Sequence, residues 1–275
     1  MIPAGFEYHR PADVASALAI LQTHGDEARV VAGGHSLIPM MKLRMAEIGH
    51  LIDLQDVAEL RGITVDSDTV TIGAMVTQHE LIAHENLGTA LPILKEAALQ
   101  IADPQVRYVG TVGGNVANGD PGNDMPGLMQ CLDATYTLTG PNGSRTVAAR
   151  DFYEAAYFTA REDDEILTQI SIPVTGATGF AYEKQKRKIG DYATAAAAVI
   201  IGNGTASLAM TNLADTPVWS QEANRALAEG NVEGAVSALM SAIDPNEDMR
   251  GPVEFKNHVA EIILRRAIDR AQSRA

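Results

Sequence analysis

Cysteine is almost absent from this sequence, since Cys131 is the only one among 275 residues. One thiol cannot form a disulfide within the chain, an all-cysteine zinc site or an iron–sulfur cluster. Any such centre that the protein works with must therefore lie on another chain. The histidines are scattered along the sequence without the spacing of metal ligands, so we expect no metal site.

Basic residues are also few, with 21 lysines and arginines against 35 acidic residues and a formal net charge of -14. Such a chain repels phosphate backbones, which argues against nucleic-acid binding. No apolar run approaches the roughly 18 residues that span a bilayer. The first residues lack a basic region followed by an apolar stretch, so we expect no signal peptide and a cytoplasmic protein without a membrane span.

The two common nucleotide-binding motifs are missing in the required context. These are the G-x-G-x-x-G fingerprint of NAD-binding folds and the P-loop G-x-x-x-x-G-K-[ST]. A Rossmann-type NAD enzyme and an ATPase therefore lose their main support. Apolar residues make up 46% of the chain. That is enough to bury the cores of two or three small domains.

Three regions follow one another along the chain. The pattern of residues 1–55 predicts an α/β unit, with helices near 11–23 and 37–44 and strands near 28–32 and 50–54. Residues 56–174 begin with a hairpin formed by 61–65 and 69–74. Thr77 and Glu80 have capping-box spacing and predict a helix start, and Pro92 predicts another helix as far as about residue 101.

The stretch 110–127 contains six glycines and two prolines. We interpret it as a long structured loop that serves function rather than as core, because it is poor in apolar side chains. In the third region, residues 180–188, 192–201 and 205–212 predict a three-stranded antiparallel meander. Residues 195–198 are all alanine, which prefers helix, but the β-branched residues and turn that follow favour a strand. The pattern is helical from residue 220, with a last helix over 252–274.

Two Gly-Gly segments resemble each other. Gly33 and Gly34 follow a predicted strand and precede a predicted helix, and Gly113 and Gly114 follow another apolar run. Glycine lets the backbone approach a ligand closely, and amides at a helix start favour an anion. Each segment alone is a weak signal because Gly-Gly turns are common. Together they suggest two loops that face one phosphate-containing ligand.

Three blocks of sequence carry a resemblance to a known family. They are AGGHSLIP at residues 32–39, DPQVR at 103–107 leading into TVGGN at 111–115, and KRKIGDYA at 186–193. With these blocks the whole chain resembles the medium, FAD-binding subunits of the molybdenum hydroxylases, and most of all those of the carbon monoxide dehydrogenase type. The resemblance implies an α+β fold. A two-part FAD-binding domain, a small α/β part over 1–55 and a mixed part over 56–174, precedes a C-terminal domain over 175–275 with a three-stranded antiparallel sheet and a helical bundle.

The resemblance also implies one FAD and a set of residues that contact it. The Gly-Gly loops would hold the pyrophosphate, Asp124 would lie near the ribose, Leu167 near the adenine, and Lys184 with the 191–192 pair near the flavin ring. The implied FAD contacts are Ala32, Gly33, Gly34, His35, Ser36, Leu37, Ile101, Ala102, Thr111, Gly113, Gly114, Asn115, Asp124, Leu167, Lys184, Asp191 and Tyr192. No catalytic side chain and no metal ligand is expected. The basic residues 184–188 fit either a solvated face or a contact with the cofactor or a partner.

By the same resemblance, a large subunit oxidises the substrate at a molybdenum centre and a small subunit carries two [2Fe–2S] clusters. This chain would take electrons from the clusters to FAD and pass them to an external acceptor, in a dimer of heterotrimers. Two other interpretations stay open at this point: a flavin oxidoreductase that acts on its own substrate, and a binding module without a cofactor. The resemblance places the substrate pocket on another chain and makes carbon monoxide the first candidate, while aldehydes, purines and other N-heterocycles stay open.

Overall fold

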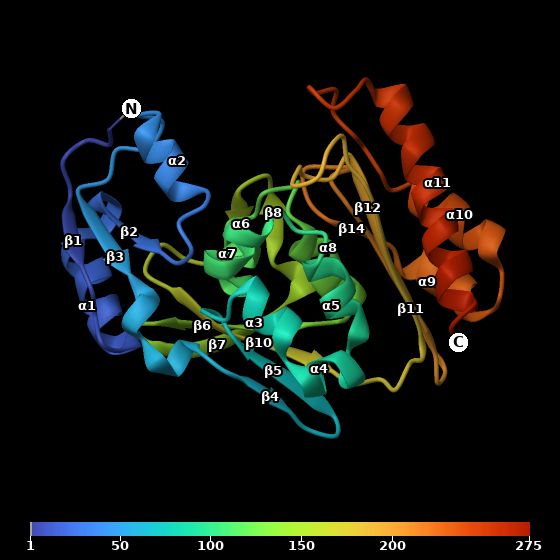
Figure 1. The fold of residues 1–275 in the computed structure, drawn as a ribbon, viewed down its shortest axis with the longest axis horizontal. Coiled ribbons are helices and arrows are strands. Elements are labelled where there is room, and N and C mark those ends of the chain that lie inside the picture. The colour runs from blue at the N-terminus through green and yellow to red at the C-terminus, as the bar shows by residue number, and fades with distance from the viewer. Residues whose placement is uncertain (1) are drawn as a thin grey trace.

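The computed structural model describes residues 2–275. Three sheets follow one another along the chain and lie side by side, from the N-terminal end at the left of Figure 1 to the C-terminal end at the right. The predicted α+β class is confirmed. Among residues 2–275, no helix is both long and apolar enough to cross a membrane.

The N-terminal sheet is parallel and has the order β1-β3-β2, from β1 (Glu7–His9), β3 (His50–Asp53) and β2 (Ala28–Val31). Helix α1 (Val14–His24) packs on one face and α2 (Leu37–Lys42) on the other. Neighbouring residues of a strand point to opposite faces, so Ile52 packs toward α1 and Leu51 toward α2. The sequence predicted these elements except β1, which is only three residues long.

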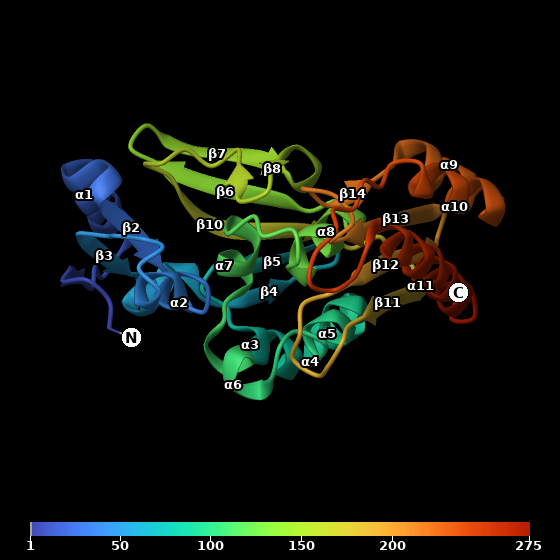
Figure 2. The same ribbon diagram turned by 90° about the horizontal axis from the view of Figure 1, so that it is seen from above.

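The middle sheet is antiparallel, with the order β4-β5-β10-β6-β7. Its strands are β4 (Ile63–Val65), β5 (Thr69–Gly73), β6 (Thr135–Gly140), β7 (Gly143–Ala148) and β10 (Ile166–Pro173). The helices are α3 (Gln78–Ala83), α4 (Glu85–Ala90), α5 (Pro92–Ala98), α6 (Pro104–Val109), α7 (Val112–Ala117) and α8 (Asp124–Cys131). Figure 2 shows α3 to α6 on the side away from the β6–β7 hairpin.

Short elements complete this part of the chain. A two-stranded ribbon is formed by β8 (Tyr153–Ala155) and β9 (Phe158–Thr159). Single 3-10 turns occur at Gly25–Glu27, Leu54–Asp56, Ala58–Leu60 and Ala149–Asp151. The predicted helix starts are confirmed, since Thr77 and Glu80 form a capping box and Pro92 opens α5.

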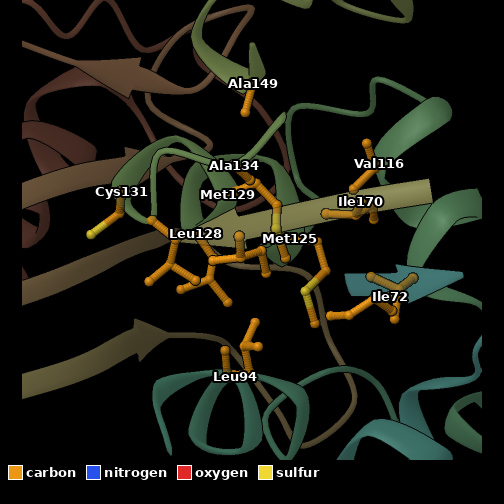
Figure 3. Packing of buried hydrophobic residues seen from close by; sticks show 14 of the residues in the cluster. Ile72, Leu94, Val116, Met125, Leu128, Met129, Cys131, Ala134, Ala149 and Ile170 are labelled. Atoms are coloured by element: carbon orange, nitrogen blue, oxygen red, sulfur yellow. The ribbon is translucent and has the colours of Figure 1, made fainter. Parts of the chain in front are cut away.

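The expectation of a long loop outside the core at residues 110–127 was wrong. This stretch forms α7 and the first half of α8, and every residue of α8 is buried. Figure 3 shows Met125, Leu128 and Met129 of α8 packed among residues such as Ile72 and Ile170. Small residues let these short helices approach their neighbours closely, and burial rather than local propensity stabilises them.

Cys131 ends α8 and is buried inside the same core. Burial raises the pKa of its thiol to about 12. The thiol is therefore protonated at neutral pH and unreactive.

The C-terminal sheet is an antiparallel meander of β11 (Gly179–Gln185), β12 (Ala195–Gly202) and β13 (Thr205–Thr211), as the sequence predicted. A two-residue strand, β14 (Val218–Trp219), extends it at one edge. The helices α9 (Gln221–Ala228), α10 (Val232–Met240) and α11 (Val253–Gln272) follow, with α11 at the right of Figure 1.

Both faces of this sheet are covered, which explains the all-alanine run in β12. Ala196 and Ala198 pack into the middle core beside α8, whereas Ala195 and Ala197 pack into the core formed with α9 to α11. A strand that is buried on both faces need not alternate between polar and apolar residues. Alanine is small enough to let helices pack closely on either side.

Candidate functional site

A cavity of about 460 Å³ lies between the three sheets, a size that is typical of small-molecule sites. Every residue that the sequence analysis assigned to FAD contacts this cavity. From the N-terminal region these are Ala32, Gly33, Gly34, His35, Ser36 and Leu37; from the middle region Ile101, Ala102, Thr111, Gly113, Gly114, Asn115, Asp124 and Leu167; from the C-terminal region Lys184, Asp191 and Tyr192. The structure thus gathers segments that lie up to 160 positions apart in the sequence.

The first Gly-Gly loop presents a row of free backbone amides to the cavity. The N–H groups of Gly33, Gly34, His35 and Ser36 donate to no acceptor among residues 2–275. Gly34 has a φ of 71°, which favours glycine, and its carbonyl accepts from Ile38 N at 3.0 Å as α2 begins. Consecutive free amides that surround a left-handed residue form a concave site for an anion.

The two Gly-Gly loops are in direct contact. A Cβ on Gly33 would lie 2.5 Å from Val109 O and 2.7 Å from the Cα of Gly110. A Cβ on Gly114 would lie 3.3 Å from the Cβ of Ala32. The absence of side chains at these positions therefore lets the N-terminal and middle regions close around one end of the cavity.

The second loop uses its amides differently from the first. Val112 N donates to Val76 O at 2.8 Å, and Gly113 N donates to Ala74 O at 3.0 Å. Gly114 N donates to the hydroxyl of Thr111 at 3.0 Å, which caps α7. These three amides already have partners within the chain. That the second loop contacts phosphate remains a prediction, and the structure shows it chiefly as a packing surface.

A buried charged group lies at the wall formed by α8 and β11. Lys184 Nζ donates to Asp124 Oδ2 at 2.7 Å, with side-chain exposures of 1% and 5%. Tyr182, two residues earlier on the same face of β11, donates its hydroxyl to Asp124 Oδ1 at 2.5 Å. Burial, with the nearby Asp124, raises the pKa of Tyr182 well above its usual value, so it stays a neutral donor. The sequence analysis missed Tyr182. Its position two residues before Lys184 puts both side chains on one face of the strand, but this indicates a shared partner only once Asp124 is known to bind Lys184.

The connection between β11 and β12 forms the rim near this wall. Asp191 accepts from Arg187 Nε at 2.9 Å and from Tyr192 N at 3.0 Å. The Tyr192 ring packs against Gly122, where a Cβ would lie 2.9 Å from Cδ1 of the tyrosine. Tyr192 is 41% exposed, so it lies between the cavity and solvent.

The basic residues 184–188 do not form a single surface patch. Lys184 is buried and paired with Asp124, and the charge of Arg187 is paired with Asp191. Lys186 is partly buried, and this burial is the main cause that lowers its pKa. Repulsion from Lys184 is the next largest cause. Alternation along the strand end separates side chains that are neighbours in the sequence.

A second group of charges at the cavity wall near Leu167 was not predicted. Glu165 accepts two hydrogen bonds from Arg145, at 2.6 and 2.8 Å. Arg161 also lines the cavity and donates to Glu165 O at 3.0 Å, and burial lowers the pKa of its guanidinium. In the sequence Arg161 and Glu165 belong to an ordinary run of charged residues, 161–165. Only the packing of β10 against the N-terminal region brings them to the cavity.

Three of the histidines lie closer together than their spacing in the sequence indicated. His9, His24 and His50, which are scattered in the sequence, lie together on the N-terminal sheet, and a ring nitrogen of each is within 4.8 Å of the others. Sequence spacing gave no signal because each residue comes from a different element.

Two family models together cover nearly all of the chain. The model of the FAD binding domain in molybdopterin dehydrogenase matches residues 4–175, and that of the CO dehydrogenase flavoprotein C-terminal domain matches residues 180–271. The chain belongs to the FAD-binding medium subunits of the molybdenum hydroxylases.

Individual relatives of this flavoprotein subunit match it from end to end. It is 54% identical to the carbon monoxide dehydrogenase medium chain of Afipia carboxidovorans, over 100% of this chain and 99% of that one. It is 33% identical to the glyceraldehyde dehydrogenase medium chain of Sulfolobus acidocaldarius, over 97% and 98% of the two chains. A chain of reconstituted CO dehydrogenase from Oligotropha carboxidovorans is similar with a TM-score of 0.96, 54% identity and 100% coverage of both chains.

The cofactor of this flavoprotein subunit is FAD. The cavity fits such a molecule in two respects. The free amides of residues 33–36 suit a pyrophosphate in a chain whose net charge is strongly negative. The glycines at the loop contact let both loops meet at one end of the cavity, where a Cβ on Gly33 would overlap Val109.

Proposed function

We propose that this subunit takes electrons from [2Fe–2S] clusters on a small partner subunit and passes them, through FAD, to an external acceptor. A large partner subunit would oxidise the substrate at a molybdenum centre. Carbon monoxide is the substrate that we propose, because the relative at 54% identity is named a carbon monoxide dehydrogenase medium chain. The relative at 33% identity is named for glyceraldehyde, so the substrate varies within the family.

One observation carries this proposal. The chain coincides over its full length with a chain of CO dehydrogenase. That chain is one part of CO dehydrogenase, and every residue of this chain that we assign to FAD lines a single cavity. This supports a subunit that relays electrons over a flavin oxidoreductase that acts on its own substrate.

The roles of individual residues form part of the same proposal. Bound FAD supplies the redox chemistry, and the chain supplies binding, orientation and electrostatics. The amides of residues 33–36 would hold the pyrophosphate, and α2 would orient them. Asp124, fixed by Tyr182 and Lys184, would accept from a ribose hydroxyl, while Lys184 would keep the local charge balanced. Tyr192 would limit the access of solvent to the ring end of the cavity.

Reduction of the flavin in a reconstituted complex tests the proposed function. We expect the purified chain with FAD to stay yellow under carbon monoxide, and to bleach in a stopped-flow experiment only when both partner subunits are present. Bleaching by a substrate of the isolated chain would contradict the proposal and support an independent oxidoreductase. If aldehydes but not carbon monoxide bleach the complex, the relay stands and the substrate is wrong.

Three further points belong to the proposal. The assembly would be a dimer of heterotrimers in the cytoplasm, which sedimentation of the complex and cell fractionation would test. The chain would divide into units at 1–55, 56–174 and 175–275. The three sheets fall within these ranges, although the core around Ile52 also includes Met75 and Ile166 from the middle region.

A further inference from the structure

Three histidines from three elements meet at the N-terminal sheet. His9 lies on β1, His50 lies on β3, and His24 is the last residue of α1. His9 Nε2 is within hydrogen-bond distance of His50 Nδ1, at 3.1 Å, and the rings of His24 and His50 are stacked with their centroids 3.5 Å apart. All three side chains are partly exposed, so the cluster is accessible to small solutes.

The register of the sheet explains this meeting. His50 pairs with Glu7 and Ile52 pairs with His9, so these four residues point to the same face. Ile52 packs in the core that contains α1. His9 and His50 therefore face the helix, whose C-terminal end brings His24 onto them.

The nitrogen atoms of the three rings lie close enough together to share one metal ion, since a ligand atom of each is within 4.8 Å of the others. Zinc–nitrogen bonds of about 2.0–2.1 Å in a tetrahedral site place two ligand nitrogens roughly 3.3 Å apart. The His9–His50 distance of 3.1 Å is close to this value. Glu7 Oε2 lies 3.4 Å from the same nitrogen of His50 and offers an oxygen as a fourth ligand.

We propose that His9, His24 and His50 bind one divalent transition-metal ion, with Glu7 beside it. Imidazole ligands select zinc, copper or nickel over magnesium and calcium. The ion would join β1, which has only three residues, to α1 and β3. The site is separate from the FAD cavity, because neither Glu7 nor any of the three histidines is among the residues that line that cavity.

Zinc binding to the full-length chain, produced without a histidine tag and loaded with FAD, tests this site. Zinc would be titrated against a chelating dye in excess magnesium, which occupies non-specific carboxylates, and the bound metal would be counted by mass spectrometry. The variants are His9→Gln and His24→Gln. His258→Gln is the matched control, since His258 is exposed on α11 and far away in the sequence.

We expect one zinc per chain in the parent and in the control. Each cluster variant should bind zinc at least about tenfold more weakly, because losing even a group that only supports a metal ligand costs that much. Zinc should raise the unfolding temperature of the parent but not that of His24→Gln, because a ligand that binds only the folded state stabilises it. Circular dichroism and FAD content should be unchanged in the variants.

Two results would overturn the site. One is a parent that binds no zinc under these conditions. The other is a double variant, His9→Gln with His24→Gln, that keeps its fold and binds zinc as tightly as the parent.

Discussion

Replacing Gly33 with alanine tests the contact between the two Gly-Gly loops. The new Cβ would lie 2.5 Å from Val109 O, and ordinary contact needs at least 3.4 Å. The obstacle is backbone, so a rotamer change cannot relieve it, and the loops must separate. Overpacking of this kind costs about 1–3 kcal/mol. The backbone of Gly33 itself is not in the left-handed region, so the cost is steric.

The separation widens the end of the cavity where the free amides of residues 33–36 lie. The flavin-free chain can open to relieve the overlap, but FAD must bring the loops together again. We therefore expect the dissociation constant of FAD to rise about 5- to 150-fold, which corresponds to 1–3 kcal/mol. Fluorescence titration of the flavin-free variant measures the constant, and thermal unfolding of the same sample measures its stability.

Two further glycines serve as comparisons. Gly88 lies in α4, and a Cβ added there would have nothing within 4 Å, so Gly88→Ala should leave FAD binding unchanged and stabilise the fold by about 0.5–1 kcal/mol. Gly34→Ala should weaken FAD binding through its positive φ, at a cost of about 1–2 kcal/mol. The reasoning is refuted if Gly33→Ala binds FAD and unfolds like the parent, because the loops would then have room between them.

Two other changes probe the cavity wall. Lys184→Met leaves Asp124 buried without its cation and should lower the free energy of unfolding by about 3–5 kcal/mol, measured in urea without flavin. Adding Asp124→Asn to this variant should restore part of the lost stability. If the double variant is no more stable than Lys184→Met alone, the pairing of Lys184 with Asp124 is contradicted. Hydrogen bonds from Arg145 lower the pKa of Glu165 below its usual 4.5, so this glutamate contributes stability above that pH, and the contribution is lost as pH falls through the folded-state pKa. The difference in unfolding temperature between the parent and Glu165→Gln should therefore become smaller as the pH falls below about 4.5. A difference that stays constant would contradict the claim that Arg145 stabilises the ionised form of Glu165.

Elements with strong local signals could be read directly from the sequence. Thr77 and Glu80 cap α3, and Pro92 opens α5, each through contacts within a few residues. The turn at residues 202–204 likewise fixes the β12–β13 hairpin, because glycine and asparagine accept its positive φ values. The segments around the cavity were also found in the sequence, since the motifs of the family lie there.

Elements that depend on distant partners could not be read in this way. Helices α7 and α8 form in a stretch of glycines and prolines, because burial against β5, β10 and the C-terminal sheet stabilises them where local propensity does not. Strand β1 is too short to give a periodic signal, and only its pairing with β3 defines it.

The sequence by itself determined the family, the cofactor and the segments that surround the cavity, because these follow from local motifs. The tertiary structure decided how those segments are used. Within residues 2–275 it gave the amides of 33–36 no acceptor while it paired those of 112–114, and it placed Lys184 and Tyr182 on Asp124, about 60 positions away. It also brought His9, His24 and His50 together. Such contacts join residues far apart in the chain, and only the packing of whole elements determines which of them meet.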